Sequence, residues 1–404
     1  MDRRTLLKTA AALAGLGRFA AAATGLRVVV AGAGIVGASI AWHLARAGAS
    51  VTVIDKQGPA THASRGTFAW INATWAKQPR HYHRLNQDGL SQWKTLQQGL
   101  EIPVRWGGSL EWFDRAERQA SLAGQIAEQV AWGEPARMLD ADEFSALEPG
   151  VKLLGAESAA YSPNDGAVDP VLATRILLSS ARSSGARIQH PCELRGIRTD
   201  GHRLVAVETS TGTLPADRLV VATGAEPRIP ELTAGIAIPQ RSTPGIIAVT
   251  RPLPRLIHRI IVAPGIHLHQ RDDGRVVMGE QDGAPQTEAH AARLQGRPND
   301  FPSPVIARQH GHRMLEIARR YVPEIEGAEI EQAVIGWRPL PIDGHPVLGT
   351  NPQRPHVYLA IMHSGVSLAP AVGQLVAQEL TGDVSLDALA PYRPTRSFRQ
   401  VRRY

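Results

Sequence analysis

The chain has 404 residues, of which 43% are hydrophobic and 20% are charged, a composition typical of a globular protein with about two domains. The single cysteine, Cys192, excludes an internal disulfide and a thiolate metal cluster. The formal net charge of +7 is concentrated near the two ends of the chain, and no basic stripe crosses its middle. We therefore expect a mildly basic surface that favours anionic small molecules, and no nucleic-acid partner.

Residues 1–25 resemble a twin-arginine export signal. Arg3 and Arg4 precede a weakly apolar stretch that ends in a run of four alanines at 20–23. Arg18 interrupts the stretch, which is too short to span a membrane, and no other segment approaches that length. The sequence predicts a periplasmic or secreted protein. A frayed N-terminal helix on a cytoplasmic protein is the alternative.

A strand, a glycine-rich turn and a helix follow this segment. The apolar run 26–30 is typical of a parallel strand buried on both faces, a helix is expected over 38–47, and a second strand over 51–54 ends at Asp55. In such a unit the glycines allow a tight turn and the close approach of a pyrophosphate at the helix N-terminus, while the acid binds a ribose. The predicted dinucleotide site consists of Gly32, Ala33, Gly34, Ile35, Val36, Gly37, Asp55 and Lys56.

Two later segments decide between NAD and FAD, which the acid alone leaves open. A buried strand over 217–222 leads into Thr223 and Gly224. The segment 335–346, which contains Gly-Trp-Arg-Pro, precedes a strand over 357–360 and a helix over 369–380. In this order the segments resemble the D-amino-acid oxidase superfamily of FAD enzymes, which contains glycine oxidase, sarcosine oxidase and D-amino-acid dehydrogenase. The resemblance covers almost everything after residue 26.

The resemblance implies an α/β fold with a Rossmann-like FAD-binding domain and an interleaved α+β substrate domain built on a mostly antiparallel sheet. The FAD-binding domain would comprise 26–75, 150–235 and 330–390, and the substrate domain 76–149 and 236–329. Residues 391–404 would form a basic tail. The segments also predict helices near 82–100 and 305–321, a strand over 186–189, a hairpin within 265–279 and a polar surface excursion at 286–304.

The same resemblance implies further contacts to FAD. The loop 62–69 matches one that wraps the pyrophosphate and flavin, Cys192 lies where a backbone contact to adenine is expected, and 363–368 opens a helix toward the flavin. No cysteine stands beside Gly336 and Trp337, where sarcosine oxidases attach flavin covalently, so we expect noncovalent FAD. The cofactor residues implied are Ser64, Arg65, Thr67, Ala69, Cys192, Thr223, Gly224, Ser364, Gly365, Val366, Ser367 and Leu368.

Four residues are candidates for substrate binding or catalysis. By resemblance, Arg338 occupies the position of an arginine that binds the substrate carboxylate, and a structural salt bridge is the alternative. His267 and His269 share one face of a strand, which could line the cavity or face solvent. His363 is either an acid or base or only a neighbour of the flavin. No third ligand is spaced to join the paired histidines, so we expect no metal.

The resemblance therefore implies FAD-dependent oxidative deamination of an amino acid or secondary amine, by hydride transfer from Cα to flavin N5. The electron acceptor, O2 or a quinone or other carrier, stays open. An NAD-linked dehydrogenase sharing only the first βαβ unit, and a catalytically silent flavoprotein subunit, are the alternatives.

Overall fold

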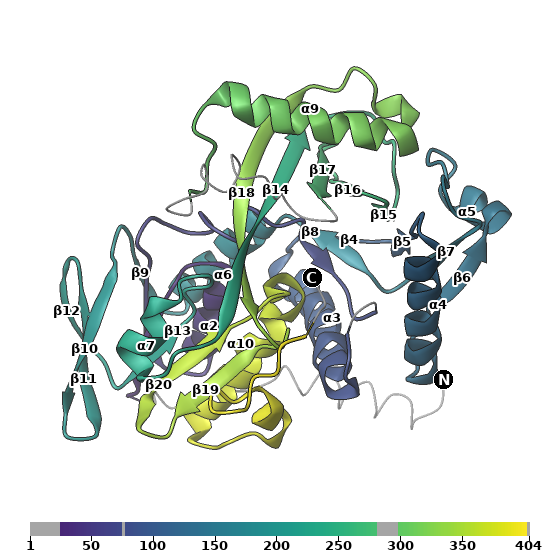
Figure 1. The fold of residues 1–404 in the computed structure, drawn as a ribbon. Coiled ribbons are helices and arrows are strands. Elements are labelled where there is room, and N and C mark those ends of the chain that lie inside the picture. Colours follow the sequence, from purple (N-terminus) through teal and green to yellow (C-terminus); the bar gives the residue numbers. More distant parts are fainter. Residues whose placement is uncertain (1–24, 75–76, 281–297, 402–404) are drawn as a thin grey trace, which may run out of the picture.

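Residues 25–74, 77–280 and 298–401 are described by a computed structural model. Their strands form a six-stranded sheet, an eight-stranded sheet and two three-stranded sheets (Figure 1). The predicted export signal lies almost entirely outside the described residues, as does most of the predicted surface excursion at 286–304.

The six-stranded sheet has the order β19-β20-β13-β1-β2-β9. All of its strands run parallel except β19, which pairs antiparallel with β20. Their bounds are β1 (Arg27–Ala31), β2 (Ser50–Ile54), β9 (Arg187–Gln189), β13 (Arg218–Val221), β19 (Val347–Asn351) and β20 (Arg354–Ile361).

Both faces of this sheet are covered, which explains the continuous apolar runs of its strands. Val28 and Val30 of β1 belong to the core beneath the helices, whereas Val29 and Ala31 belong to the core on the opposite face. The helices on the first face are α2 (Ile35–Arg46), α3 (Arg80–Leu100), α6 (Pro170–Ser183) and α10 (Gly365–Gly382). The opposite face carries the sheet of β10 (Leu194–Asp200), β11 (Arg203–Thr209) and β12 (Gly212–Pro215), together with α7 (Arg228–Ala234).

The eight-stranded sheet has the order β18-β14-β17-β16-β15-β5-β7-β6, and only β5 and β15 pair in parallel. Met314 and Tyr321 of α9 (Pro304–Tyr321) pack on one face, where α9 crosses the sheet (Figure 1). The strands are β5 (Ser109–Glu111), β6 (Arg137–Asp140), β7 (Ser158–Ser162), β14 (Gln240–Thr250), β15 (Ile260–Ala263), β16 (Ile266–Gln270), β17 (Val276–Glu280) and β18 (Ile330–Pro341). The remaining helices are α4 (Ala116–Ala131), α5 (Ala141–Leu147), η1 (Pro323–Ile325) and η2 (Asp387–Tyr392).

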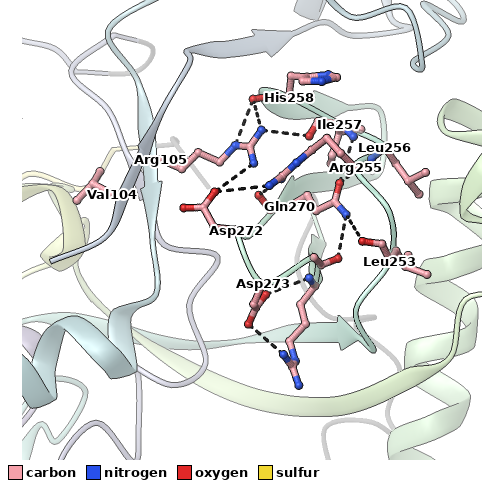
Figure 2. Close-up of polar contacts among 12 residues, drawn as sticks. Val104, Arg105, Leu253, Arg255, Leu256, Ile257, His258, Gln270, Asp272 and Asp273 are labelled. Carbon is pink, nitrogen blue, oxygen red and sulfur yellow. Dashed lines mark hydrogen bonds and ion pairs between the residues drawn. The ribbon is translucent and has the colours of Figure 1, made fainter.

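The hairpin β16–β17 is held by a polar network shown in Figure 2. Arg105 lies on β4 (Val104–Trp106), which forms the second three-stranded sheet with β8 (Gly166–Val168) and β3 (Trp70–Ile71). Its guanidinium donates to the carbonyls of Ile257 and His258 and lies 3.6 Å from Asp272. Gln270 binds the same segment before β15. Its side-chain amide donates to Pro254 O at 2.7 Å and accepts from Leu256 N at 2.8 Å.

The structure confirms the expected fold class and the strands and helices named from the sequence. The first helix begins at Ile35, three residues earlier than expected, because it starts immediately after its N-cap Gly34. The predicted domain segments stay a prediction. Within the described residues, β18 pairs with β14 in the eight-stranded sheet, and α3 packs on α10 through a hydrogen bond of 2.8 Å from Trp93 Nε1 to Val366 O.

Part of the predicted basic tail is anchored to the layer that contains α10. Arg393 forms two hydrogen bonds with the buried Glu379 carboxylate, at 2.5 and 3.0 Å. Arg396 similarly contacts Asp343, with 2.8 Å from Nε to Oδ2. These arginines are therefore used in internal ion pairs. None of the described helices is long and apolar enough to cross a bilayer.

Candidate active site

The glycines after β1 form a cradle that side chains would fill. Gly32 has φ +107°, and a Cβ there would lie 2.8 Å from the carbonyl carbon of Ala222, at the end of β13. A Cβ on Gly37 would lie 3.1 Å from the Gly32 carbonyl carbon. The sequence explanation of this turn, which assigned a tight turn to Gly32 and close helix packing to Gly37, agrees with these contacts.

The N-terminus of α2 points out of this cradle. Gly34 is its N-cap and provides no side-chain cap, and the first turn contains no acid. Ser64, from the loop 62–69, accepts a hydrogen bond from Ile35 N at 3.0 Å. The next N–H groups, of Val36 and Gly37, belong to the first turn, whose donors have no partners within the helix. An anion such as a pyrophosphate suits this helix end.

Asp55 lies at the end of β2, beside the same turn. Its carboxylate accepts from Ala33 N at 2.8 Å, Gln57 N at 2.9 Å and Gly58 N at 2.8 Å. A carboxylate has about four lone-pair sites, so it retains capacity for a ribose hydroxyl. Lys56 is 3.8 Å from Glu226.

Cys192 packs directly against this strand end. Its backbone N donates to Asp55 O at 2.7 Å, and its buried thiol lies 3.1 Å from Thr211 Oγ1. These contacts fit a small structural residue beside the nucleotide end of the site.

The loop 62–69 crosses β18 at two glycines. A Cβ on Gly66 would lie 2.6 Å from Gly336 N, and a Cβ on Gly336 would lie 2.6 Å from the Gly66 carbonyl carbon. The backbones therefore meet without side chains between them. Within the loop, Thr67 Oγ1 accepts from Ala69 N at 3.2 Å, and Ala69 is buried with φ +63°. Arg65 points elsewhere and pairs with Asp300 at 2.7 Å.

Arg338 lies two residues beyond this crossing. It pairs with Thr243 in the β14–β18 ladder, and its guanidinium lies over Gly245, where a Cβ would be 2.9 Å from Nη2. Burial lowers the pKa of His363, two residues before α10, and the charge of the Arg338 guanidinium lowers it further. Segments far apart in the sequence thus converge on one site that joins a nucleotide cradle, a guanidinium and a second helix N-terminus.

The family model for FAD-dependent oxidoreductases (DAO) matches residues 27–379. The chain belongs to the DAO family of FAD-dependent oxidoreductases. Glycine oxidase from Geobacillus kaustophilus is 26% identical over 386 residues, covering 93% of this chain and 98% of the relative. The crystal structure of glycine oxidase from that organism has a TM-score of 0.81 at 24% identity, covering 92% of this chain and 99% of that one. Iminodiacetate oxidase from Chelativorans sp. BNC1 has a TM-score of 0.75 at 25% identity, covering 91% and 99%.

The residues around the cradle fit the FAD that this family uses. Thr223 Oγ1 is buried and has no hydrogen-bond partner, and it follows β13 directly beside Gly32. Gly224 continues the turn with φ +62°. A buried hydroxyl without a partner costs free energy unless a ligand completes it. Together with the uncapped α2 terminus, this observation supports a bound dinucleotide. The described residues include no group of three His, Cys, Asp or Glu side chains arranged to hold a metal ion.

The second helix terminus begins at Ser364, which has φ +57° and provides no side-chain cap to α10. Ser364 Oγ lies 3.2 Å from His363 Nδ1. Gly365 and Val366 open the first turn, and Leu368 N donates to Ser364 O at 3.1 Å.

The hydroxyl of Ser367 makes two hydrogen bonds within the chain, and its contact with FAD stays a prediction. Its hydroxyl donates to Trp70 O and accepts from Asn72 N, both at 3.1 Å.

His363 is held neutral by its surroundings. Burial, followed by the charges of Arg338 and Lys77, lowers its pKa to about 3. The imidazole therefore carries no charge at neutral pH and is not a protonated acid there.

His267 and His269 both turn toward Phe68 of the loop 62–69. Their ring centroids lie 5.3 and 4.9 Å from that of Phe68. His269 is buried, and its Nε2 donates to Phe68 O at 3.0 Å. Burial, followed by the charge of Arg271, lowers its pKa to about 3. The arrangement makes His269 a support for the loop, and a catalytic role for either histidine stays a prediction.

Two buried titratable residues in the neighbourhood of this site were missed by the sequence analysis. Lys77 is 6% exposed, and its ammonium donates to Ser364 Oγ at 3.2 Å. Asp165 is fully buried and accepts from Trp70 Nε1 at 2.9 Å and Ser109 Oγ at 2.6 Å. Lys77 lies in a polar segment typical of a loop, and Asp165 lies in an Asn-Asp-Gly turn. Neither pattern signals burial.

Proposed function

We propose that the protein oxidises an amino acid or a secondary amine that carries a carboxylate. The position of Arg338 carries the proposal, because its guanidinium lies over Gly245 and acts electrostatically on His363 at the start of α10. An arginine fork binds a carboxylate through two parallel hydrogen bonds, a geometry that lysine cannot reproduce. Glycine and iminodiacetate, which appear in the names of two relatives, are amines with a carboxylate.

When bound, FAD supplies a two-electron acceptor for a hydride. The residues of the chain hold the substrate and balance charge. Arg338 would fix the carboxylate and so position Cα, and the uncapped N-terminus of α10 would face the negative charge that develops on hydride transfer. The neutral His363 adds no positive charge beside the amine.

In the substrate, the Cα–H bond breaks with its electron pair while the nitrogen lone pair forms a C=N bond. Water then adds to the carbon of this imine. Ammonia or a shorter amine leaves, and a 2-oxo acid remains. The proton of the ammonium form would be lost before binding.

Anaerobic bleaching of the purified yellow protein tests this function. We expect bleaching by at least one member of a panel of D- and L-amino acids, glycine and N-methyl amines. Arg338→Ala should raise KM strongly for a carboxylate substrate while FAD stays bound, and Arg338→Lys should restore only part of the affinity. A protein that binds FAD yet is bleached by no amine would favour a silent flavoprotein subunit. A colourless protein that takes up no FAD on reconstitution would refute the proposal.

Three finer points belong to the same proposal. We infer that FAD is bound noncovalently, so acid denaturation should release it intact. We infer that either O2 or a quinone-like carrier reoxidises the protein, and comparing turnover in air with turnover on an artificial acceptor distinguishes them. We also infer that residues 1–25 direct export. Replacing Arg3 and Arg4 by lysine should then retain the protein in the cytoplasm.

A further inference from the structure

Lys77 places an amino group in the interior beside the N-terminus of α10. Its ammonium donates to Ser364 Oγ at 3.2 Å and lies 5.7 Å from the centre of the Tyr82 ring. The residue is only 6% exposed. Burying an ammonium carries a desolvation cost, which its contacts with a hydroxyl and a ring face help to offset.

The charge of Lys77 acts on both sides of this position. On one side it opposes the rise in the pKa of Asp165 that burial causes. On the other side, burial lowers the pKa of His363, and the charges of Arg338 and Lys77 lower it further. Lys77 is therefore electrostatically coupled to the buried carboxyl of Asp165 and to His363, which lies two residues before α10.

Positive charge is unfavourable at this end of α10. A helix N-terminus carries about half a positive charge, so cations are destabilising near it and anions are stabilising. Here two cations, Lys77 and Arg338, act at the same uncapped terminus. Negative charge that is brought to the site during the reaction would be stabilised by these two cations. The substrate carboxylate accounts for one charge, at Arg338. Hydride transfer delivers a second charge, because two electrons arrive with one proton.

We propose that Lys77, held by Ser364, supplies a full positive charge to the N-terminal end of α10 and thereby raises the midpoint potential of the bound flavin. The proposal rests on the proposed function, which brings the flavin to this helix end. A direct contact between Lys77 and a second substrate carboxylate is the competing role. The burial of Lys77 and its hydrogen bond to Ser364 favour the first role, because an ammonium that binds substrate needs an open face toward it.

The test measures the midpoint potential by dye equilibration, without substrate. Lys77→Gln removes the charge and retains a group able to donate to Ser364. We expect its two-electron reduction equilibrium to become about tenfold less favourable, which corresponds to about 30 mV. Lys77→Arg keeps the charge and should stay within threefold of the wild type. Lys94→Gln is the matched control, because Lys94 is exposed on the neighbouring helix α3 and should leave the potential unchanged.

Several results would overturn the proposal. One is a Lys77→Gln protein that holds FAD and has the wild-type potential. Another is an unchanged potential combined with a large rise in KM, which would make Lys77 a substrate ligand. If Lys77→Gln retains no FAD, Ser364→Ala replaces it: losing the anchor should lower the potential measurably, and an unchanged potential would refute the role. Failure of the proposed function is distinguishable, since the wild type would then bind no flavin or be bleached by no amine.

Discussion

The backbone crossing of Gly66 and Gly336 makes Gly336→Ala the most informative single change. A Cβ on Gly336 would lie 2.6 Å from the Gly66 carbonyl carbon and 2.8 Å from its Cα. The Gly66 carbonyl oxygen would lie closer still, and ordinary contact begins at 3.4 Å, so one backbone must move by more than about 0.8 Å. Both neighbours are backbone atoms, and neither can rotate away as a flexible side chain would.

The displacement should affect activity more than stability. Overpacking of this kind costs about 1–3 kcal/mol of unfolding free energy. A misplacement of about 1 Å at a reacting group can cost about 100-fold in rate. We therefore expect kcat/KM to fall by about two orders of magnitude, together with weaker FAD binding, while the protein still folds.

The assays are urea unfolding, FAD titration of the apoprotein, and steady-state kinetics on the best substrate of the panel. Gly124→Ala is the matched control: it lies inside α4, and a Cβ there would meet nothing within 4 Å. That change should leave activity intact and stabilise the protein by about 0.5–1 kcal/mol. If Gly336→Ala binds FAD and turns over like the wild type, the loop and β18 do not constrain each other, and the reasoning fails.

Three further predictions concern other buried groups. Burial raises the pKa of Asp165 to about 7 from an unfolded value of 3.8, so the native state binds the proton more tightly and loses stability as pH rises from about 4 to 7. Asp165→Asn should therefore be more thermally stable than the wild type between pH 5 and 8. Parallel curves of Tm against pH for the two proteins would contradict this. Because the pKa of His363 is about 3, His363→Gln should leave the acid-side inflection of kcat/KM in place, and a displaced inflection would show that His363 titrates. Arg393→Met strips a buried carboxylate, Glu379, of its ion pair and should cost about 3–5 kcal/mol in urea unfolding. The exposed Arg399→Met should cost almost nothing, and equal effects would refute the difference.

The sequence predicted the individual strands and helices correctly, because the patterns that indicate them lie within short segments. The run of β1, the glycine turn and the acid after β2 lie within one short segment, and each has a steric or electrostatic reason that the structure reproduces. The order of later segments then identified the family, and the fold class followed.

Contacts between residues far apart in the chain could not be predicted from the single sequence. Gly66 is one glycine in a polar loop. A side chain is excluded at this position because the backbone of Gly336, far along the chain, lies against it. The burial of Lys77 likewise depends on α10 and on Tyr82 packing over it, and neither is marked in its own segment. The alternation of side chains along a strand indicated that His267 and His269 share one face of the sheet. That Phe68 of the loop 62–69 packs against this face could not be predicted from the strand alone.

In the proposed site, the periodicity of β18 would link cofactor binding to substrate binding. Gly336 and Arg338 are two residues apart and so share one face, about 7 Å apart along the strand. Trp337 points to the other face, where Nε1 donates to Pro298 O at 2.9 Å and anchors the strand. The guanidinium turns back to lie over Gly245, the ladder partner of Gly336. Because Gly336 abuts the loop that the family resemblance assigns to FAD, we expect a shift of that loop at Gly66 to displace Arg338 as well. Cofactor affinity and KM for the carboxylate should therefore change together in variants of this crossing, and independently in variants of Arg338 itself.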